Sequence, residues 1–247
     1  MSGHSKWSTI KRAKGAADAK RGQLFTKLTR EIMLSVREGG ASLDSNYALR
    51  LAIQKAKDNN MPSENIDRAV KRATGEGGAA NLAEFSLEGY GPNGVALLIE
   101  ALSDNRNRTV QEIRSVLNRH GGSLGEAGCV AWLFDTHGVI TIDGDADKAD
   151  EIALQAIDAG ADDVKTDGGY VEVYTEPAKL EEVRHALESE FTVTSAEVSL
   201  VPKTSIMLED SKAVQMMKFI DALESLDDVK QVYSNADFAD SAFEQMG

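Results

Sequence analysis

A chain of 247 residues is long enough to form two or three small hydrophobic cores. Its 42% hydrophobic and 27% charged residues are typical of globular proteins and exclude a disordered or fibrous chain. Apolar runs such as Val95–Ile99 are too short to span a membrane, and the basic N-terminus lacks the apolar core of a secretion signal. The single cysteine, Cys129, excludes an intramolecular disulfide, so we expect a cytoplasmic protein with no membrane partner.

Charge is distributed unevenly along the chain. Residues 1–74 contain 15 Lys and Arg against 7 Asp and Glu, a net charge of +8. Residues 75–247 contain 12 Lys and Arg against 33 Asp and Glu, a net charge of −21, so the whole chain carries −13. Because phosphate repels an acidic body, the N-terminal end would approach a nucleic acid first. A second interpretation is that the basic end docks on the acidic remainder of its own chain. The sequence leaves both interpretations open.

The positive charge is concentrated before residue 38. Residues 2–15 are small, polar and basic, which favours irregular backbone. Trp7, the largest apolar side chain there, either stacks on a base or, as we favour, pins this segment to the first helix. The candidate nucleic-acid-binding residues are Lys6, Trp7, Lys11, Arg12, Lys14, Lys20, Arg21, Lys27, Arg30 and Arg37.

Three helices are predicted before residue 75. The first runs from Asp18 to Gly39-Gly40, and its apolar stripe of Leu24, Phe25, Leu28, Ile32 and Val36 lies opposite Lys20, Lys27, Arg30 and Arg37. The second spans about Ser45 to Lys57, with Tyr47, Leu49, Leu51 and Ile53 as candidates for its buried side. The third follows a cap at Ser63 and buries Ile66, Ala69, Val70 and Ala73, which leaves Arg68, Lys71 and Arg72 outward. Lys71 and Arg72 would widen the basic patch.

These helices predict a small basic bundle that ends in a hinge, Gly75-Glu76-Gly77-Gly78. A basic unit of three helices invites a helix-turn-helix interpretation. The connections do not show which helix would enter a groove, so this interpretation has little support.

Beyond the hinge, short strands alternate with helices. Phe85–Tyr90 and Val95–Leu102 predict a hairpin around Gly91-Pro92-Asn93-Gly94. Residues 89–94 match the GxGxxG pattern of dinucleotide sites, but that pattern opens a helix, whereas a β-rich run follows here. We therefore expect a turn there and no cofactor.

A polar segment, Asp104–Thr109, precedes a predicted helix that ends near Arg119 and buries Val110, Ile113, Val116 and Leu117. Arg106 and Arg108 are secondary candidates for phosphate binding, although we favour a capped and solvated loop. A strand is predicted from Cys129 to Phe134, with Cys129 as a small core residue rather than a nucleophile.

Residues 139–201 predict the order βαββαβ of a ferredoxin-like fold. The predicted strands are Val139–Ile142, a strand near Val164, Tyr170–Tyr174 and Ala196–Val201, and the predicted helices are Asp147–Ala159 and Ala178–Glu190. Asp143, Asp145, Asp147 and Asp150 suggest a calcium loop, but Lys148 and Leu154 stand at its sixth and twelfth places. We read these acids as a helix N-terminus and predict no metal site.

The C-terminal part has no sheet of its own. Its pattern predicts a helix from about Ser211 to Leu226 and a strand, Val229–Tyr233. The pattern of Phe85–Phe134 predicts a sheet with one face left uncovered. We therefore expect an α+β fold in which a basic three-helix bundle precedes two ferredoxin-like α/β domains, one inserted in the other. The expected domains are 1–78, with the N-terminal arm; 79–136 plus 204–240, discontinuous; and 137–203, inserted.

Several segments resemble one protein family. They are Gly3-His4-Ser5-Lys6-Trp7, Asp18-Ala19-Lys20-Arg21-Gly22 leading to Phe25-Thr26-Lys27, Asn59-Asn60-Met61-Pro62, Glu88-Gly89-Tyr90-Gly91-Pro92 and Ser103–Thr109. Together they closely resemble the YebC/PmpR family over essentially the whole chain. The resemblance implies a cytoplasmic protein with a helical N-terminal domain and two α/β domains. It also implies either DNA-binding transcriptional regulation, described for bacterial members, or action on the ribosome, as in a related mitochondrial translational activator of a cytochrome oxidase subunit.

We therefore expect a non-enzymatic nucleic-acid-binding regulator of gene expression, with DNA as its target. The alternative is a ribosome-associated translation factor that binds ribosomal RNA. The acidic α/β domains would position the protein or bind protein partners, and the oligomeric state is left open. An enzyme is the contrasting hypothesis, but no spacing singles out a pair of carboxylates, and the histidines, His4, His120, His137 and His185, lack metal-ligand spacing.

Overall fold

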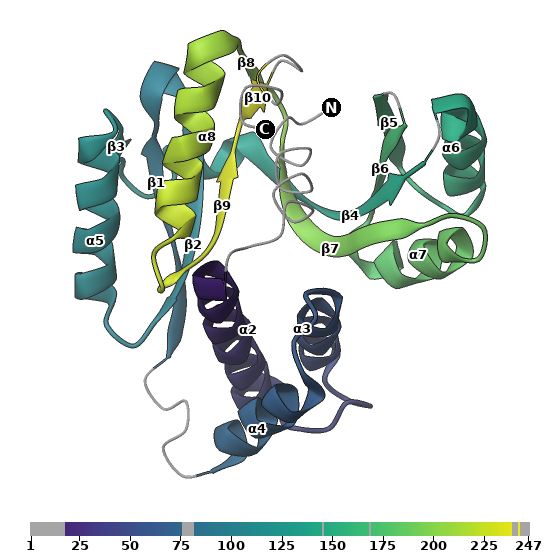
Figure 1. The fold of residues 1–247 in the computed structure, drawn as a ribbon, viewed down its shortest axis with the longest axis horizontal. Coiled ribbons are helices and arrows are strands. Elements are labelled where there is room, and N and C mark those ends of the chain that lie inside the picture. The colour runs from purple at the N-terminus through teal and green to yellow at the C-terminus, as the bar shows by residue number, and fades with distance from the viewer. Residues whose placement is uncertain (1–17, 76–81, 145, 168, 239–241, 243–247) are drawn as a thin grey trace.

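The computed structural model describes residues 18–75, 82–144, 146–167, 169–238 and 242, which form a helical bundle followed by two antiparallel sheets with their helices (Figure 1). The bundle contains α2 (Asp18–Gly39), α3 (Tyr47–Asp58) and α4 (Ser63–Thr74). The prediction of a mixed fold of helices and sheets with a helical N-terminal region is confirmed. The predicted hinge beyond residue 75 lies outside the described residues.

One apolar core holds the three helices together. Leu28, Ile32 and Val36 of α2 are buried, as the predicted stripe requires. They belong to the same cluster as Leu49 of α3 and Ile66 of α4. The spacing of apolar residues by three and four therefore identified the inward faces of α2 and α4 correctly, whereas on α3 only Leu49 of the four predicted residues is buried.

Asn46 fixes the corner between α2 and α3. Its Oδ1 accepts a hydrogen bond from the backbone N–H of Leu49 at 3.0 Å, and its Nδ2 donates to the carbonyl oxygens of Ser35 and Gly40, both at 2.7 Å. These bonds satisfy backbone groups at both helix ends. Because Asn46 is the cap, α3 begins at Tyr47 rather than at the predicted Ser45, and Tyr47 is 42% exposed instead of buried.

The first sheet has the strand order β3-β1-β2-β9. β1 (Ala83–Tyr90) and β2 (Ala96–Ser103) form the predicted hairpin, and the short β3 (Ser123–Leu124) lies beside β1. β9 (Val229–Ser234) pairs with β2 in antiparallel fashion. The strand predicted near the C-terminus thus completes a sheet that begins before residue 137.

The glycines of residues 89–94 have structural roles in this hairpin. A Cβ atom on Gly89 would lie 2.5 Å from the carbonyl oxygen of Ser123, and one on Gly91 would lie 2.9 Å from Phe219 Cε1. Gly94 has a φ of +77°, in the region that favours glycine. The turn predicted here is confirmed, and β2 follows it in place of the helix that a dinucleotide site requires.

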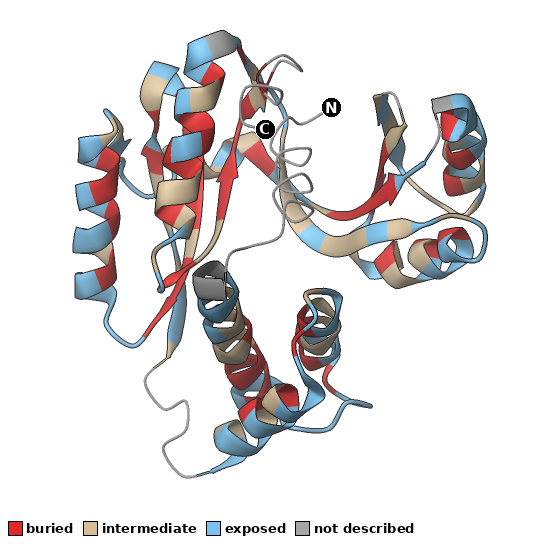
Figure 2. Cartoon of the chain, in the orientation of Figure 1, coloured by how far each residue is buried: buried red, intermediate tan, exposed pale blue. Residues whose placement is uncertain are grey.

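Two helices, α5 (Arg106–Arg119) and α8 (Asp210–Glu224), pack on one face of the first sheet. Ile99 of β2, Ile113 of α5 and Phe219 of α8 are fully buried in this core. Figure 2 shows burial along the strands and on the inward sides of these helices. β8 (Ile206–Leu208) and β10 (Ala236–Phe238) form a parallel pair that contributes to the same core. We call this assembly the first sheet unit.

The strand predicted over residues 129–134 is wrong for residues 129–133, and only Phe134 belongs to a strand. Ala131–Leu133 is a 3₁₀ turn. The Glu88 carboxylate accepts hydrogen bonds from the N–H groups of Gly128, Val130 and Ala131 at 2.6, 2.7 and 2.8 Å. The Glu88 side chain therefore occupies the amide groups that would have to pair with a neighbouring strand. Val130 is buried against the face of the first sheet opposite the one that α5 and α8 cover.

The second sheet has the order β5-β6-β4-β7, with all neighbours antiparallel. Its strands are β4 (Phe134–Asp143), β5 (Asp163–Asp167), β6 (Tyr170–Thr175) and β7 (Val193–Pro202), and its helices are α6 (Ala149–Asp158) and α7 (Leu180–Glu188). The predicted βαββαβ order is confirmed. Both helices start after a 3₁₀ turn, later than predicted, and β4 runs through residue 136, where a domain boundary was expected. We call this assembly the second sheet unit.

Phe219 offers a test of the core of the first sheet unit. It is fully buried and stacks on His120 with ring centroids 5.3 Å apart, so Phe219→Ala should cost about 3–5 kcal/mol in the free energy of unfolding. Urea unfolding followed by circular dichroism measures this loss. Leu154→Ala, at a side chain that is 65% exposed, is the control and should cost less than about 0.5 kcal/mol. Equal losses in the two variants would contradict the packing described.

Candidate nucleic-acid interface

The structure describes part of the predicted interface. Lys6, Trp7, Lys11, Arg12 and Lys14 lie outside the described residues, and Lys20 is described only as part of the helix α2. The candidate side chains that the structure describes are those of Arg21, Lys27, Arg30, Arg37, Lys71, Arg72, Arg106 and Arg108. The binding role of all these residues stays a prediction.

Two cations of α2 contact the first sheet unit. Lys27 Nζ donates to the carbonyl oxygen of Glu224, the last residue of α8, where the helix dipole attracts positive charge. Arg30 Nη1 lies 2.9 Å from the carbonyl oxygen of Asp227 and 2.9 Å from Asp228 Oδ1. This part of the basic face therefore docks the bundle onto its own chain, as the second interpretation of the charge pattern proposed.

Asp228 lies at the centre of this contact and is 4% exposed. Its Oδ2 accepts hydrogen bonds from Ser103 at 2.8 Å, Thr109 at 2.7 Å and Arg108 at 2.8 Å, in addition to the contact of Arg30 with Oδ1. Burial acts to raise the pKa of this carboxyl, but the hydrogen bonds from Arg108, Thr109 and Ser103 outweigh it and lower that pKa from 3.8 to about 2. Asp228 is thus ionised at neutral pH and joins α2, α5 and the start of β9.

The two secondary candidates are both engaged in contacts within the chain. Arg108 binds Asp104 at 2.9 Å as well as Asp228, and its backbone N–H donates to Asn105 Oδ1, which caps α5. The favoured prediction of a capped loop is therefore confirmed. The Arg106 guanidinium lies 4.7 Å from the ring centroid of Phe85, a cation–π arrangement.

Three further candidate cations, Arg37, Lys71 and Arg72, lie toward the other end of the bundle, whereas Arg21 lies in the first turn of α2. Arg37 Nη1 donates to the carbonyl oxygen of Leu82 at 2.6 Å. Lys71 and Arg72 are exposed near the end of α4, and their side chains have no ion pair with any described residue. Figure 1 shows α4 on the part of the bundle turned away from both sheets. Phosphate can therefore reach these two cations without rearrangement of the chain.

Sequence reasoning missed the half-buried cation Lys230 on β9. Its Nζ lies 2.6 Å from Glu84, 3.7 Å from Glu100 and 4.0 Å from Glu31. Burial acts to lower the pKa of Lys230, but these carboxylates outweigh it and raise that pKa above its usual value. No spacing in the sequence identifies Lys230, because its partners come from three distant segments.

Asp228 was also missed, although the sequence holds a partial signal for it. The segment Ser103–Thr109 supplies three of its side-chain donors, Ser103, Arg108 and Thr109. Several hydrogen-bond-donating side chains next to a buried strand indicate that a buried hydrogen-bond acceptor lies nearby. The run does not show which carboxylate in the chain is that acceptor.

Among the described residues, no group of three His, Cys, Asp or Glu is arranged to hold a metal ion. His137 meets Tyr174 edge to face at 6.2 Å, and His185 Nδ1 lies 2.6 Å from Glu188 Oε1 on the same helix. The described histidines are thus engaged in ring and surface contacts. No helix in the described part of the chain has the length and apolar character needed to cross a membrane.

Comparison with known proteins gives matches over nearly the whole chain. Residues 5–76 match the model described as TACO1/YebC protein N-terminal domain, and residues 82–236 match the one described as TACO1/YebC second and third domain. Relatives named probable transcriptional regulatory protein include one from Dehalococcoides mccartyi, 54% identical over 96% of this chain and 95% of its own. Another, from Trichlorobacter lovleyi, is 50% identical over 100% of both chains.

One solved structure is also similar. The crystal structure of the conserved hypothetical protein Aq1575 from Aquifex aeolicus is 41% identical, with a TM-score of 0.79. The match covers 90% of this chain and 93% of that chain.

Loss of the Asp228 carboxylate should destabilise the fold in a pH-dependent way. At neutral pH, Asp228→Asn should cost about 2 kcal/mol in the free energy of unfolding. The wild-type advantage should be fully present above the unfolded-state pKa of 3.8 and disappear as the pH falls through about 2, because the folded carboxylate then binds a proton. Urea unfolding of both proteins from pH 7 to pH 2 measures the difference.

Asp104→Asn is the matched control, because Asp104 also pairs with Arg108 but is 59% exposed. An exposed pair contributes little, so this variant should change the free energy of unfolding by less than about 0.5 kcal/mol at any pH. A wild-type advantage over Asp228→Asn that is the same at pH 7 and pH 2 would refute the role given to Asp228.

Proposed function

Because the chain belongs to the TACO1/YebC family, we propose that it is a non-enzymatic, cytoplasmic regulator of gene expression that binds nucleic acid. The relatives' names, probable transcriptional regulatory protein, support DNA as the target. The observation that carries the proposal is the exposed pair Lys71 and Arg72 on the outward side of a basic bundle, in a chain that is otherwise acidic.

We propose that the chain functions as the three domains expected from its sequence, at 1–78, 79–136 plus 204–240, and 137–203. The pairing of β9 with β2 across the intervening residues supports a discontinuous second domain. The separate core of the second sheet unit supports the inserted third domain. In this proposal the bundle binds nucleic acid, and the two acidic units position it or bind protein partners.

The proposed interface consists of the N-terminal arm, the first turn of α2 and the exposed end of α4. Its residues are Lys6, Trp7, Lys11, Arg12, Lys14, Lys20, Arg21, Lys71 and Arg72. Lys27 and Arg30 contribute only if the bundle leaves the first sheet unit, because both now bind its backbone and carboxylate oxygens. Arg106 lies apart from the bundle, on α5, and is a minor candidate.

Ribosomal RNA is the second candidate target, and one observation on α4 favours it. A recognition helix contacts base edges with its N-terminal residues. On α4 these include Glu64 and Asp67, both exposed, and carboxylates there repel the phosphates that border a groove. The cations Lys71 and Arg72 lie at the other end, a distribution better suited to contact with an RNA backbone than to reading a DNA sequence.

A direct competition between the two targets tests the proposal. Labelled duplex DNA and ribosomes are titrated at matched physiological salt with wild type and with the triple variant Lys11→Glu, Arg12→Glu, Lys14→Glu. We expect the variant to lose binding by at least tenfold, because six units of charge change at the proposed interface. The control changes the same charge elsewhere: Arg114→Glu, Lys212→Glu, Lys218→Glu, at exposed residues of α5 and α8.

Stronger binding to ribosomes than to DNA, lost in the arm variant alone, would make this protein a translation factor. Stronger binding to particular promoter DNA would make it a transcriptional regulator. Binding to neither target, or equal losses in the arm and control variants, would refute the proposed interface.

The salt dependence of binding tests Lys71 and Arg72 separately. If each binds a phosphate, Lys71→Ala with Arg72→Ala should reduce the slope of log affinity against log salt concentration by about 2 for duplex DNA, and by somewhat less for single-stranded RNA. The matched control is Lys212→Ala with Lys218→Ala, which should leave the slope unchanged. Titrations between about 50 and 300 mM salt measure it, and an unchanged slope in the α4 variant would remove these residues from the interface.

A further inference from the structure

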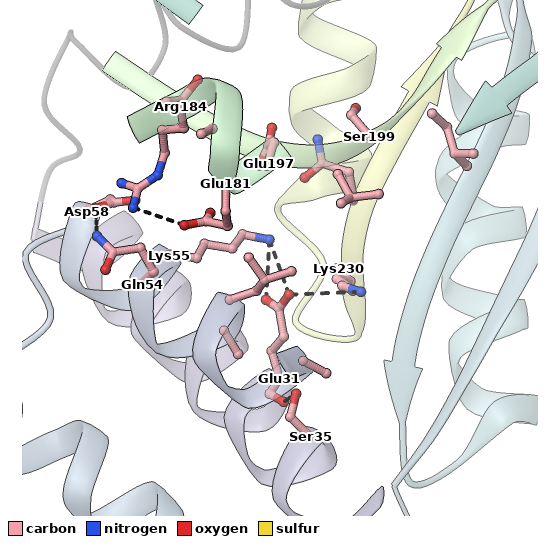
Figure 3. A pocket seen from close by; sticks show the side chains of 18 of the residues that line it. Glu31, Ser35, Gln54, Lys55, Asp58, Glu181, Arg184, Glu197, Ser199 and Lys230 are labelled. Atoms are coloured by element: carbon pink, nitrogen blue, oxygen red, sulfur yellow. Dashed lines mark hydrogen bonds and ion pairs between the residues drawn. The ribbon is translucent and has the colours of Figure 1, made fainter. Parts of the chain in front are cut away.

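A cleft of about 760 Å³ lies where the bundle meets both sheet units (Figure 3). α2 and α3 supply one wall, β7 and α7 supply another, and β9 closes it with side chains from β1 and β2. Its size falls within the range of roughly 300–1,000 Å³ found for ligand pockets. The cleft is distinct from the exposed cations of α4 that carry the proposed function.

The walls of this cleft are strongly acidic. Among the described residues that line it, eight carry carboxylates and three carry cations, Lys55, Arg184 and Lys230. Each cation is already paired: Lys55 with Glu31 at 3.3 Å, Arg184 with Glu181 at 3.1 Å, and Lys230 with Glu84 at 2.6 Å. The cleft therefore has an excess of negative charge, which repels nucleic acid and attracts a cationic ligand.

Two of the carboxylates have no cationic partner among the described residues. They are Glu38 on α2 and Asp58 on α3, both exposed. Apolar side chains lie among the acids, including Leu34 of α2, Leu51 of α3 and Val198 of β7, which is 37% exposed. A ligand that fits these walls carries positive charge and apolar groups together.

The β7 wall of the cleft is the edge of a sheet. In the order β5-β6-β4-β7, only β4 pairs with β7 among the described strands. Every residue from Val193 to Leu200 lines the cleft. Since alternate side chains of a strand point to opposite faces, an unbroken run of lining residues means that the strand presents its backbone edge. Such an edge offers N–H donors and C=O acceptors to another strand.

We propose that this cleft binds an extended, cationic segment of a partner protein, which adds a strand to the free edge of β7. Main-chain hydrogen bonds hold the segment, and its alternate side chains place Lys or Arg beside the carboxylates and apolar groups beside Leu34, Leu51 and Val198. A polyamine matches the charge but accepts no hydrogen bonds from the N–H groups of β7. A cationic polypeptide can both form hydrogen bonds with the edge of β7 and pair its charges with the carboxylates of the cleft. This inference does not depend on the proposed nucleic-acid binding.

The test uses a fluorescein-labelled peptide of four Lys-Val repeats, titrated with the full-length protein at physiological salt and followed by fluorescence anisotropy. Two competitors separate the contribution of main-chain hydrogen bonds from that of charge. The same peptide with every backbone amide N-methylated keeps the charge but loses all main-chain donors, and spermidine supplies charge alone. We expect the N-methylated peptide and spermidine to compete at least tenfold more weakly than the unmodified peptide.

Matched variants locate the binding. Glu38→Lys with Ser199→Lys places cations on the α2 and β7 walls and should weaken peptide binding at least tenfold. Glu112→Lys with Ser115→Lys makes the same charge change at exposed positions of α5, outside the cleft, and should have an effect below twofold. A milder pair, Glu38→Gln with Asp58→Asn, tests the charge if the first variant does not fold.

Hydrogen exchange supplies a readout that does not depend on charge. Peptide binding should slow exchange of the amides of Val193–Leu200 that β4 leaves unpaired, and it should not change exchange in α5. Absence of binding, equal losses in the cleft and α5 variants, or equal competition by spermidine and peptide would each overturn the proposal.

Discussion

The position of the bundle depends on one buried carboxylate, Asp228. A buried charge is costly unless it is paired and hydrogen-bonded, and here Ser103, Thr109 and Arg108 satisfy one oxygen while Arg30 reaches the other. Three of these donors belong to the first sheet unit itself, so this unit alone orients the carboxylate to which Arg30 of α2 binds. The pairing is strongly directional, and it fixes which side of α2 faces the sheet. The shape of the acidic cleft follows from this orientation.

The molecule keeps its two kinds of charge on separate surfaces. Cations remain accessible on α4, whereas the cleft between the bundle and the sheets has an excess of carboxylates. Each surface repels the ligands that the other attracts. Where the two signs of charge meet, the half-buried ammonium of Lys230 lies between carboxylates from α2, β1 and β2. Under the two proposals, a bound nucleic acid and a bound cationic segment would therefore lie on separate surfaces.

Local patterns in the sequence predicted the elements well, and contacts between distant segments could not be predicted. Helical spacing identified α2, α4 and α8, and the Pro-Asn-Gly turn identified the first hairpin. The failed strand at residues 129–134 shows the limit, since Glu88, far away in the chain, takes its amides. Charge pattern alone also gave no way to decide whether Arg30 binds a phosphate or a carboxylate. The cleft could not be predicted from the sequence because its lining residues come from many segments that are far apart in the chain.

The pairing of Arg30 with Asp228 joins residues 198 positions apart, and this separation has a consequence for protein synthesis. The bundle emerges from the ribosome early, whereas β9 must emerge and pair with β2 before the docking surface exists. Throughout that interval Lys27 and Arg30 are uncovered. A chain still being made therefore exposes a wider basic face than the finished molecule, and the pairing of β9 with β2 is the event that covers it.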